Sequence, residues 1–307
     1  MKILILGAGA TGGYFGGRLA SAGIDTEFLV RPKRAAQLAV DGIVIESPFG
    51  TIKTSVKTVT AADLAGSHDC VILSCKAYDL ASAIIAIRPA VGPHTLILPL
   101  LNGIKHLDAL DAAFGVERVL GGSCHLSVTM GDDGMIRHLN QLHLLTFGPR
   151  VPGQSKDCRA LLPVLTRGGF DVKLRDDIMQ AMWDKWVLLA SLAGLTCLFR
   201  ASVGEIMASG DGRRLMLAAI EECRSIAAVS GFEPTAGHIA TIGGLLTDPA
   251  SKVVASMLRD MQKGTPIEAD LIIGDMLRRG QAAGLATPLL TVAATNLACY
   301  ENRLKAA

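Results

Sequence analysis

A glycine-rich turn near the start of the chain constrains the fold more than any other feature of the sequence. Lys2–Leu6 is a short, nearly continuous apolar run, which is typical of a central parallel strand covered on both faces. Gly7–Gly12 follows directly with the pattern G-x-G-x-x-G, and an alanine-rich helical stretch then runs to Gly23. The order of strand, glycine turn and helix predicts the opening of a doubly wound, Rossmann-type α/β domain.

Each glycine of this turn has a separate predicted task. Gly7 permits the tight turn, Gly9 lets the backbone approach a pyrophosphate, and Gly12 lets the helix pack closely on the strand. The helix N-terminus adds unpaired N–H groups and a partial positive charge, which favour phosphate. In this context the turn predicts a bound dinucleotide, although a glycine turn can also serve packing alone.

The residues after the second strand indicate which dinucleotide is bound. Thr26–Val30 reads as that strand, and the place where an NAD-preferring site carries a carboxylate holds Arg31, followed by Pro32, Lys33 and Arg34. A guanidinium binds the 2′-phosphate of NADP in a two-pronged fashion, whereas a carboxylate repels it. We therefore expect NADP(H). The alternative is a solvated basic loop, with Glu27 wrongly discounted as the ribose-binding carboxylate.

Length and charge set the broad class of the protein. A chain of 307 residues exceeds the usual size of one domain, so we expect two domains with two cores. Half the residues are hydrophobic, as in an ordinary globular interior. The formal net charge of +2 is too near neutral to indicate a nucleic-acid groove. We expect no nucleic-acid partner.

The cysteines, histidines and apolar stretches exclude several other classes. The seven cysteines are scattered and form no C-x-x-C pair, which predicts reduced thiols in a cytoplasmic protein. The seven histidines show no metal-binding spacing, so we expect no metal; only His125 is placed near the site. The longest apolar stretch, Trp186–Phe199, is about two-thirds of the ~20 residues that a membrane span requires. It reads as a buried core helix, and we expect no membrane association.

Two further buried strands end in polar residues. Asp69–Ser74 leads into Lys76, and Thr95–Leu100 leads into Asn102. Open parallel sheets bind ligands at the carboxyl ends of their strands, so Lys76 is placed beside the cofactor. Asn102 can offer a carbonyl and an amide to the nicotinamide or to a substrate oxygen. The alternatives are a lysine at a surface helix or strand end, and a plain Asn-Gly turn.

The domain boundary is predicted near residue 175, giving an NADP-binding domain over 1–175 and a helical substrate and catalytic domain over 176–307. Other elements predicted in the first domain are a helix over 35–40, a hairpin of 42–45 with 51–54, a strand over 118–120, a hairpin of 134–138 with 143–147, a helix over 155–167 and a strand over 168–174. Helices predicted in the second domain cover 178–193, 213–230, 235–246, 251–261, 266–283 and 288–304.

Three residues of the second domain are candidates for chemistry. Lys185 enters an apolar stretch of helix, where desolvation would lower its pKa toward an acid/base range and let it protonate a carbonyl. The commoner fate of such a lysine is to snorkel to solvent. Thr265–Glu268 reads as a capping box with proline at the first helical position, which explains Glu268 structurally without excluding catalysis. Ser256 can equally be a small helix-packing residue.

Taken together, these motifs resemble the ketopantoate reductase family over essentially the whole chain. The residues that carry the resemblance, in order, are Gly7, Gly9 and Gly12, Arg31, Cys75-Lys76-Ala77-Tyr78, Leu101-Asn102-Gly103-Ile104, Trp183-x-Lys185, Ser256-Met257-Leu258-x-Asp260 and Glu268. The resemblance implies a two-domain, 6-phosphogluconate-dehydrogenase-like fold with an all-α C-terminal domain. It also implies the NADPH-dependent reduction of 2-dehydropantoate to pantoate for pantothenate and coenzyme A synthesis.

The resemblance also implies roles for single residues. Lys185 is the expected general acid at the ketone, and Glu268 positions it or binds the substrate hydroxyl. Asn102 is expected at both cofactor and substrate, and Ser256 at the substrate carboxylate. The expected cofactor-binding residues are Gly7, Gly9, Ala10, Thr11, Gly12, Arg31, Lys76 and Asn102.

One departure from the family pattern concerns the substrate. The lysine helix of the family usually continues with asparagines one and two turns later, and this chain has Leu189 and Ala193 there. Each missing buried hydrogen bond weakens hydroxy-acid binding by roughly 1–3 kcal/mol. The leading hypothesis is a 2-oxo acid reductase. The alternatives are a related enzyme for a less polar 2-oxo or 2-hydroxy acid, and a non-catalytic NADPH-binding regulator. A helical half of this apolarity can also support a homodimer.

Overall fold

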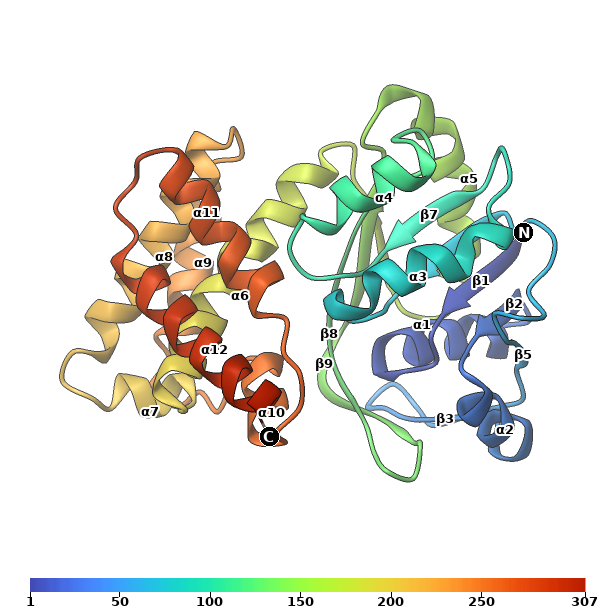
Figure 1. The fold of residues 1–307 in the computed structure, drawn as a ribbon, viewed down its shortest axis with the longest axis horizontal. Helices are drawn as coiled ribbons and strands as arrows, with labels where there is room; N and C mark the ends of the chain where they lie inside the picture. The colour runs from blue at the N-terminus through green and yellow to red at the C-terminus, as the bar shows by residue number, and fades with distance from the viewer. Residues whose placement is uncertain (307) are drawn as a thin grey trace. The chain divides into compact units, whose positions relative to one another are not determined.

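The computed structural model describes residues 1–306 and divides into two compact units (Figure 1). The first unit comprises Met1–Leu101 and His106–Ala181, and the second comprises Asn102–Lys105 and the chain from Met182 onward. The sequence placed the boundary near residue 175, whereas this division falls inside a long helix and gives the Asn102 segment to the second unit. The units are described separately below.

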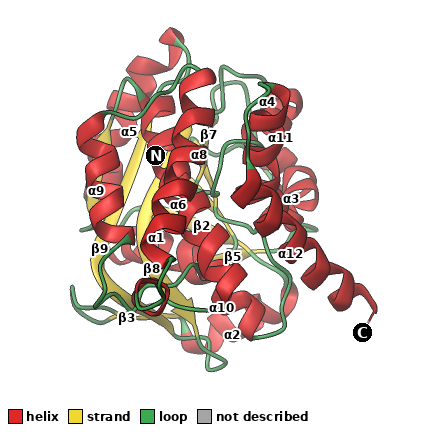
Figure 2. Ribbon diagram, turned by 90° about the vertical axis from the view of Figure 1, so that its left-hand side faces the viewer, coloured by secondary structure: helices red, strands yellow, loops and turns green. Residues whose placement is uncertain are grey.

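The first unit is built on a five-stranded parallel sheet in the order β5-β2-β1-β6-β7. Figure 2 draws the strands in yellow and the helices in red, and labels β2, β5 and β7 of this sheet. The strands are β1 (Lys2–Leu6), β2 (Asp25–Leu29), β5 (Lys57–Val59), β6 (Cys70–Leu73) and β7 (Leu96–Pro99). All residues of β6 and β7 are buried, as their continuous apolar sequences predict. The strand order reverses between β1 and β6, which is the doubly wound arrangement expected from the glycine turn.

A second sheet of this unit runs in the order β10-β9-β3-β4, and β8 also pairs with β9. Its strands are β3 (Ile43–Glu46), β4 (Ile52–Thr54), β8 (Gly121–Met130), β9 (Ile136–Gly148) and β10 (Asp171–Leu174). The predicted hairpin of 42–45 with 51–54 is confirmed as the antiparallel pair β3–β4.

Two strand predictions in this unit are wrong. Residues 134–138 and 143–147 do not form a hairpin, because both lie in the single strand β9, which pairs antiparallel with β8. Between these two segments, the Asn140 side chain accepts a hydrogen bond from the Ser127 N–H, beside a register shift in β8. The predicted strand at 118–120 is reduced to a bridge between Val119 and Ile97.

Helix α1 (Ala10–Ser21) packs closely on both sheets at positions occupied by glycine. A Cβ atom on Gly16 would lie 2.7 Å from the Phe28 ring of the first sheet, and one on Gly17 would lie 2.9 Å from Ile43 of the second. The glycines therefore let one helix lie in close contact with two sheets. The other helices of this unit are α2 (Pro32–Asp41), η1 (Ala77–Asp79), α3 (Leu80–Ile87), η2 (Arg88–Ala90), α4 (His106–Phe114), η3 (Pro152–Gln154) and α5 (Ser155–Thr166).

The second unit is helical, as predicted. Its elements are α6 (Ile178–Phe199, which begins in the first unit), α7 (Val203–Met207), α8 (Gly212–Val229), α9 (Ala236–Leu246), α10 (Ser256–Gln262), the π-helix η4 (Asp270–Gly274), α11 (Asp275–Ala282) and α12 (Pro288–Ala306). Two helix predictions differ from the structure. The helix expected over 251–261 begins at Ser256. The helix expected over 266–283 begins later and consists of the π-helix η4 followed by α11.

Helix α6 is the core helix of this unit. Among residues 1–306 it is the helix whose length and composition would suit a membrane span, but 72% of its most apolar window is buried inside the protein. Burial of this extent is typical of the core helix that the sequence predicted.

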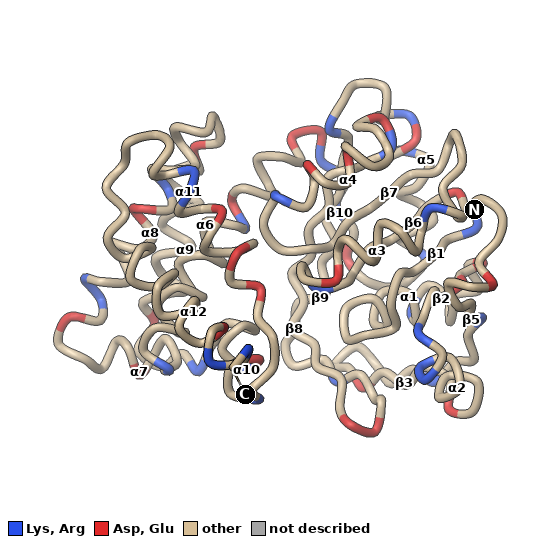
Figure 3. Tube along the Cα trace, viewed as in Figure 1, with Lys and Arg blue, Asp and Glu red and all other residues tan. Residues whose placement is uncertain are grey.

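Charge and thiol chemistry agree with an ordinary globular interior. Basic and acidic residues are interspersed along both units (Figure 3). All seven cysteines are free thiols. Burial raises the pKa of the Cys70 and Cys158 thiols to about 12, so these two groups stay neutral and are poor nucleophiles.

Candidate functional site

The glycine loop has the geometry that a dinucleotide phosphate requires. Gly7 has a φ of 86° and donates its N–H to the Leu29 carbonyl at 2.9 Å, which ties the start of the turn to the end of β2. Gly9 is the N-cap of α1, and no side chain caps the helix there. A Cβ atom on Gly9 would meet nothing within 4 Å, so the space before the helix N-terminus is open.

Gly12 serves a different purpose. A Cβ atom there would lie 2.2 Å from Ser74 Oγ and 2.4 Å from the Gly7 carbonyl oxygen. The Ser74 hydroxyl also donates to the Leu6 carbonyl at 3.1 Å, so α1 is held close against the ends of β1 and β6. Ala10 and Thr11 form the first residues of α1, directly beside the open space. The loop therefore fits a dinucleotide's phosphates, since its N–H groups are uncapped and its approach is clear.

Arg31 lies where the sequence placed it, after β2. It is the N-cap of α2, and no side chain caps that helix either. The Arg31 side chain is 82% exposed and contacts one partner in the described structure, the Asp79 carboxylate at 3.2 Å. The guanidinium therefore stands beside a helix N-terminus in solvent, where a phosphate group would be attracted by both.

Arg34 has a role that the sequence did not reveal. Its Nε donates to the Ala8 carbonyl at 3.2 Å, and its Nη2 donates to the Gly134 carbonyl at 3.4 Å. Partial burial lowers the pKa of this guanidinium. Arg34 therefore braces the glycine loop, whereas Arg31 stays available. The run of cations at 31–34 was the sequence signal, but it could not show which cation is committed to structure.

Lys76 lies on the loop after β6, next to the point where the strand order reverses. It is the N-cap of η1, and its carbonyl accepts the Asp79 N–H at 3.0 Å. Ligands of doubly wound sheets bind at such a reversal, so the placement agrees with a cofactor role for Lys76.

In the second unit, Asn102 and Lys185 are brought together. Lys185 Nζ donates to Asn102 Oδ1 at 3.3 Å, although the two residues are 83 positions apart. The Asn102 loop is fixed by Gly103, which has a φ of 68°, and a Cβ atom there would lie 2.8 Å from the Leu271 carbonyl oxygen. Lys105 adds an ion pair to Asp270 at 2.7 Å. The loop is thereby clamped against η4.

Glu268 stands at the start of the same helical segment. The predicted capping box is wrong, because 265–268 are not helical and the Thr265 hydroxyl donates to the Asp260 carbonyl instead. Helical backbone hydrogen bonding begins at Glu268, whose carbonyl accepts the Ile272 N–H at 3.1 Å. The Glu268 residue is 7% exposed. A buried carboxyl beside a π-helix is an unusual arrangement, and π-helical turns are frequent at functional sites.

The helix of Lys185 is joined to the segment of Glu268. Trp186, the next residue after Lys185, donates its indole N–H to the Ile272 carbonyl at 2.9 Å. Ile272 is also the residue whose N–H bonds to Glu268. The structure thus holds Asn102, Lys185 and Glu268 on three mutually connected segments of one unit.

The helix positions beyond Lys185 are apolar. Leu189 and Ala193 follow Lys185 at intervals of four residues, so the three side chains share one face of α6. Leu189 is half-buried, and Ala193 is 3% exposed. Ser256 is exposed at the first position of α10, so it is not a helix-packing residue. The N–H of the preceding Ala255 lies 3.4 Å from the Thr196 hydroxyl of α6.

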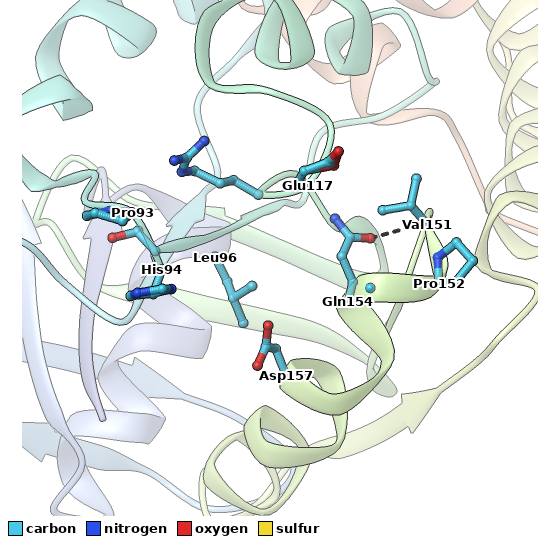
Figure 4. Close-up of a pocket in the computed structure, with 11 residues that line it drawn as sticks. Pro93, His94, Leu96, Glu117, Val151, Pro152, Gln154 and Asp157 are labelled. Carbon is cyan, nitrogen blue, oxygen red and sulfur yellow. Dashed lines mark hydrogen bonds between the residues drawn. The ribbon is translucent and has the colours of Figure 1, made fainter.

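A surface pocket of about 640 Å³ lies elsewhere in the first unit (Figure 4). Its lining residues are Pro93, His94, Thr95, Leu96, Glu117, Arg118, Val151, Pro152, Gly153, Gln154 and Asp157. It lies at the entry to β7, away from the carboxyl ends of the strands, and Gln154 at its wall is occupied by bonds to the Val116 and Val119 carbonyls. None of the predicted site residues lines this pocket.

The remaining candidate, His125, is a strand residue. His125 lies within β8. Within residues 1–306 no group of three or more His, Cys, Asp or Glu side chains could hold a metal ion.

Comparison with known families decides the classification. The family model described as "Ketopantoate reductase PanE/ApbA" matches residues 3–151, and the model of its C-terminal domain matches residues 177–301. The chain belongs to the ketopantoate reductase family. It is therefore an oxidoreductase of a family that acts on CH–OH groups with nicotinamide cofactors.

Individual relatives cover the whole chain. An uncharacterised oxidoreductase, YkpB of Bacillus subtilis, is 34% identical over 98% of this chain and 99% of its own length. A 2-dehydropantoate 2-reductase of Mesorhizobium japonicum is 26% identical over 94% of each chain.

Solved structures share the fold of this family member. A 2-dehydropantoate 2-reductase of Geobacter metallireducens has a TM-score of 0.88 and 29% identity, covering 97% of this chain and 99% of its own. D-mandelate dehydrogenase, in a complex with NADH and anilino(oxo)acetate, has a TM-score of 0.90 and covers 99% of each chain. At 22% identity that second likeness concerns the fold alone.

Proposed function

We propose that this family member reduces 2-dehydropantoate to pantoate with NADPH, a step of pantothenate and coenzyme A synthesis. The observation that carries the proposal is the hydrogen bond from Lys185 Nζ to Asn102 Oδ1. The same unit also contains the buried residue Glu268, shortly before η4 in the sequence. A sensor that only binds a nucleotide needs neither a lysine held by an amide nor a buried carboxyl.

The chemistry assigned to these residues is proton transfer and orientation. Bound NADPH supplies the hydride that forms the new C–H bond at C2 of the 2-oxo acid. The Lys185 ammonium donates a proton to the carbonyl oxygen as the C=O π bond becomes a C–OH group, and solvent returns a proton to the amine. The side-chain oxygen Oδ1 of Asn102 holds the ammonium in place, and Glu268 supports the charge on Lys185 or binds the hydroxyl of the substrate.

The coenzyme is assigned as NADPH because of the residues after β2. Arg31 offers an exposed guanidinium, and the uncapped N-terminus of α2 adds a partial positive charge at the same place. The 2′-phosphate of NADPH is the group of the coenzyme that both would attract. The proposed coenzyme site in the first unit is completed by Gly9, Ala10, Thr11 and Lys76.

A second candidate substrate is a less polar 2-oxo acid. Leu189 and Ala193 favour it, because a face of α6 that carries Lys185 offers no hydrogen-bond donor at the next two turns. An apolar pocket wall cannot satisfy the hydroxyl of 2-dehydropantoate, whereas it would pack well against an alkyl or aryl group.

The test is NADPH oxidation by the purified protein with 2-dehydropantoate beside a panel of alkyl and aryl 2-oxo acids, with NADH as the coenzyme control. Efficient turnover of 2-dehydropantoate supports the first candidate. Turnover of an apolar 2-oxo acid alone supports the second. Tight NADPH binding without reduction of any 2-oxo acid contradicts both and indicates a regulator.

A further inference from the structure

The ion pair between Arg31 and Asp79 joins two loops that lie on either side of the glycine turn. Arg31 follows β2 and Asp79 ends η1 after β6, and β2 and β6 are the two neighbours of β1 in the sheet. The pair therefore reaches past the carboxyl end of β1, where the Gly7 turn begins. A dinucleotide bound at this turn has its adenosine ribose at the end of the second strand, beside the pair.

The Asp79 side chain has no other structural task that would explain it. Asp79 is the N-cap of α3, yet its side chain does not cap that helix. Its contacts to the chain are made by its backbone: the N–H donates to the Lys76 carbonyl, and its carbonyl accepts the Ser82 hydroxyl at 2.8 Å. The carboxylate is 39% exposed and points its charge at Arg31.

A carboxylate at this place acts against the guanidinium. It repels a 2′-phosphate, which carries nearly two negative charges, and it accepts hydrogen bonds from a ribose 2′-hydroxyl. Because both side chains are exposed to solvent, the pair contributes little to stability and can exchange partners readily. Arg31 can leave Asp79 for a 2′-phosphate, but the carboxylate then stays close to that phosphate.

We propose that Asp79 is a specificity-determining residue that weakens the preference of this protein for NADPH over NADH. This inference rests on the proposed role of Arg31 at the 2′-phosphate. With NADPH, Arg31 binds the phosphate while Asp79 opposes it. With NADH, the carboxylate keeps Arg31 neutralised and accepts the ribose hydroxyl. Arg31 and Asp79 together make the site tolerant of both coenzymes.

The experiment compares coenzyme affinities of Asp79→Asn with those of the unaltered protein. Dissociation constants for NADPH and NADH are measured by fluorescence titration without any 2-oxo acid, so catalytic activity does not enter the result. The substitution keeps the backbone bonds of Asp79 and removes its charge. We expect NADPH to bind about threefold to tenfold more tightly, and NADH to bind equally or more weakly. The gain in NADPH affinity should shrink as salt is added.

Two further variants make the outcome decisive. Asp25→Asn is the matched control, because Asp25 forms a comparable exposed ion pair with Lys57 at 2.7 Å, at the opposite end of β2. It should change neither affinity. Arg31→Ala should weaken NADPH selectively and thereby tests the coenzyme assignment itself.

The possible failures are distinguishable. If Arg31→Ala changes the ratio of the two affinities and Asp79→Asn leaves it within twofold, or shifts it toward NADH, the role of Asp79 is overturned alone. If Arg31→Ala weakens both coenzymes equally, the 2′-phosphate assignment under the proposed function is overturned.

Discussion

The glycine loop of the first unit and the lysine helix of the second unit are built in different ways. The loop between β1 and α1 works through its backbone, because Gly7, Gly9 and Gly12 each leave out a side chain at a different place. The region around Lys185 works through side chains that three distant segments bring together. Under the proposed function, the first binds the phosphates of the coenzyme and the second acts on the 2-oxo acid.

The difference teaches where change is tolerated in such a protein. A backbone site has few ways to vary, because any added Cβ atom alters it. A side-chain site can keep one functional residue while its neighbours change, and we propose this for Lys185 with Leu189 and Ala193 beside it. This division predicts that variants of one region alter binding of the coenzyme and variants of the other alter turnover.

Lys185→Ala should produce the largest difference between the effect on turnover and the effect on coenzyme binding. We expect kcat to fall by about 10²–10⁴-fold, because the general acid is lost, while the dissociation constant for NADPH stays within about twofold. Steady-state kinetics and coenzyme titration measure the two quantities. Lys252→Ala, at an exposed lysine of the same unit, is the control. A fully active Lys185→Ala protein would contradict the assignment.

Gly9→Ala should have the opposite signature. Gly9 has a φ of −77° and open space where the Cβ would lie, so the variant should fold with an unchanged melting temperature. The new methyl group would occupy the place of a coenzyme phosphate, and we expect binding of NADPH to weaken by about tenfold to a hundredfold.

Gly12→Ala gives the contrast within the same loop, since its Cβ would collide with Ser74 Oγ and the Gly7 carbonyl. It should lower both the melting temperature and the affinity. Unchanged NADPH affinity in Gly9→Ala would show that the phosphates do not approach this turn.

Leu189→Asn sharpens the comparison on the substrate side. A polar side chain one turn beyond Lys185 should raise kcat/KM for 2-dehydropantoate relative to an apolar 2-oxo acid by about tenfold, or ~1.4 kcal/mol. Leu188→Asn is the matched control, because Leu188 is also half-buried but lies about 100° around the helix. An equal change of the ratio in both variants would mean that Leu189 does not contact the substrate.

The pH dependence of stability should show a smaller effect, confined to the first unit. Burial, and then the positive charge of Arg18, lower the pKa of His143, which accepts or donates a bond to the Tyr14 hydroxyl at 3.0 Å. Asp171 acts in the opposite direction. Well above about pH 6.5, His143 is neutral in both the folded and the unfolded chain, so it adds no pH dependence to the free energy of unfolding.

As the pH falls below this value, the unfolded chain binds the proton first and the folded protein loses stability. We expect the free energy of unfolding to fall between pH 7.5 and 5.5, measured by chemical unfolding at each pH. His143→Gln should flatten this slope, and His94→Gln, at an exposed histidine, should leave it unchanged. A slope that is the same in all three proteins would assign the pH dependence to other groups.

The same contrast explains how far the sequence could be interpreted. The parallel sheet, α1 and the glycine loop were predictable, because strand, turn and helix signals there are local. Arg31 could be placed from the sequence. That Arg34 has a different, structural role could not, because its partners Ala8 and Gly134 are distant in sequence. Residues 134–138 and 143–147 were predicted as a hairpin because nothing local shows that both lie in β9, with β8 as the partner strand.

In the second region the helices and the candidate residues were predictable from local patterns, but the joint role of Asn102, Lys185 and Glu268 came only from the family resemblance. Thr265–Glu268 has the residues of a capping box, yet the bond of Thr265 to the Asp260 carbonyl replaces it. Asn102 follows a strand of the first unit, but Gly103 and Lys105 bind it to the second unit through Leu271 and Asp270. Contacts of this kind join segments more than a hundred residues apart, and no local pattern reports them.

The most direct test of the account is to follow the hydride itself. The protein is incubated with NADPH that carries deuterium at the transferable C4 position and with its best 2-oxo acid substrate, and the product is analysed by mass spectrometry and NMR. The account predicts a 2-hydroxy acid with one deuterium bound to C2. A 2-hydroxy acid without deuterium, or oxidised coenzyme with no hydroxy acid, would contradict the proposed reduction.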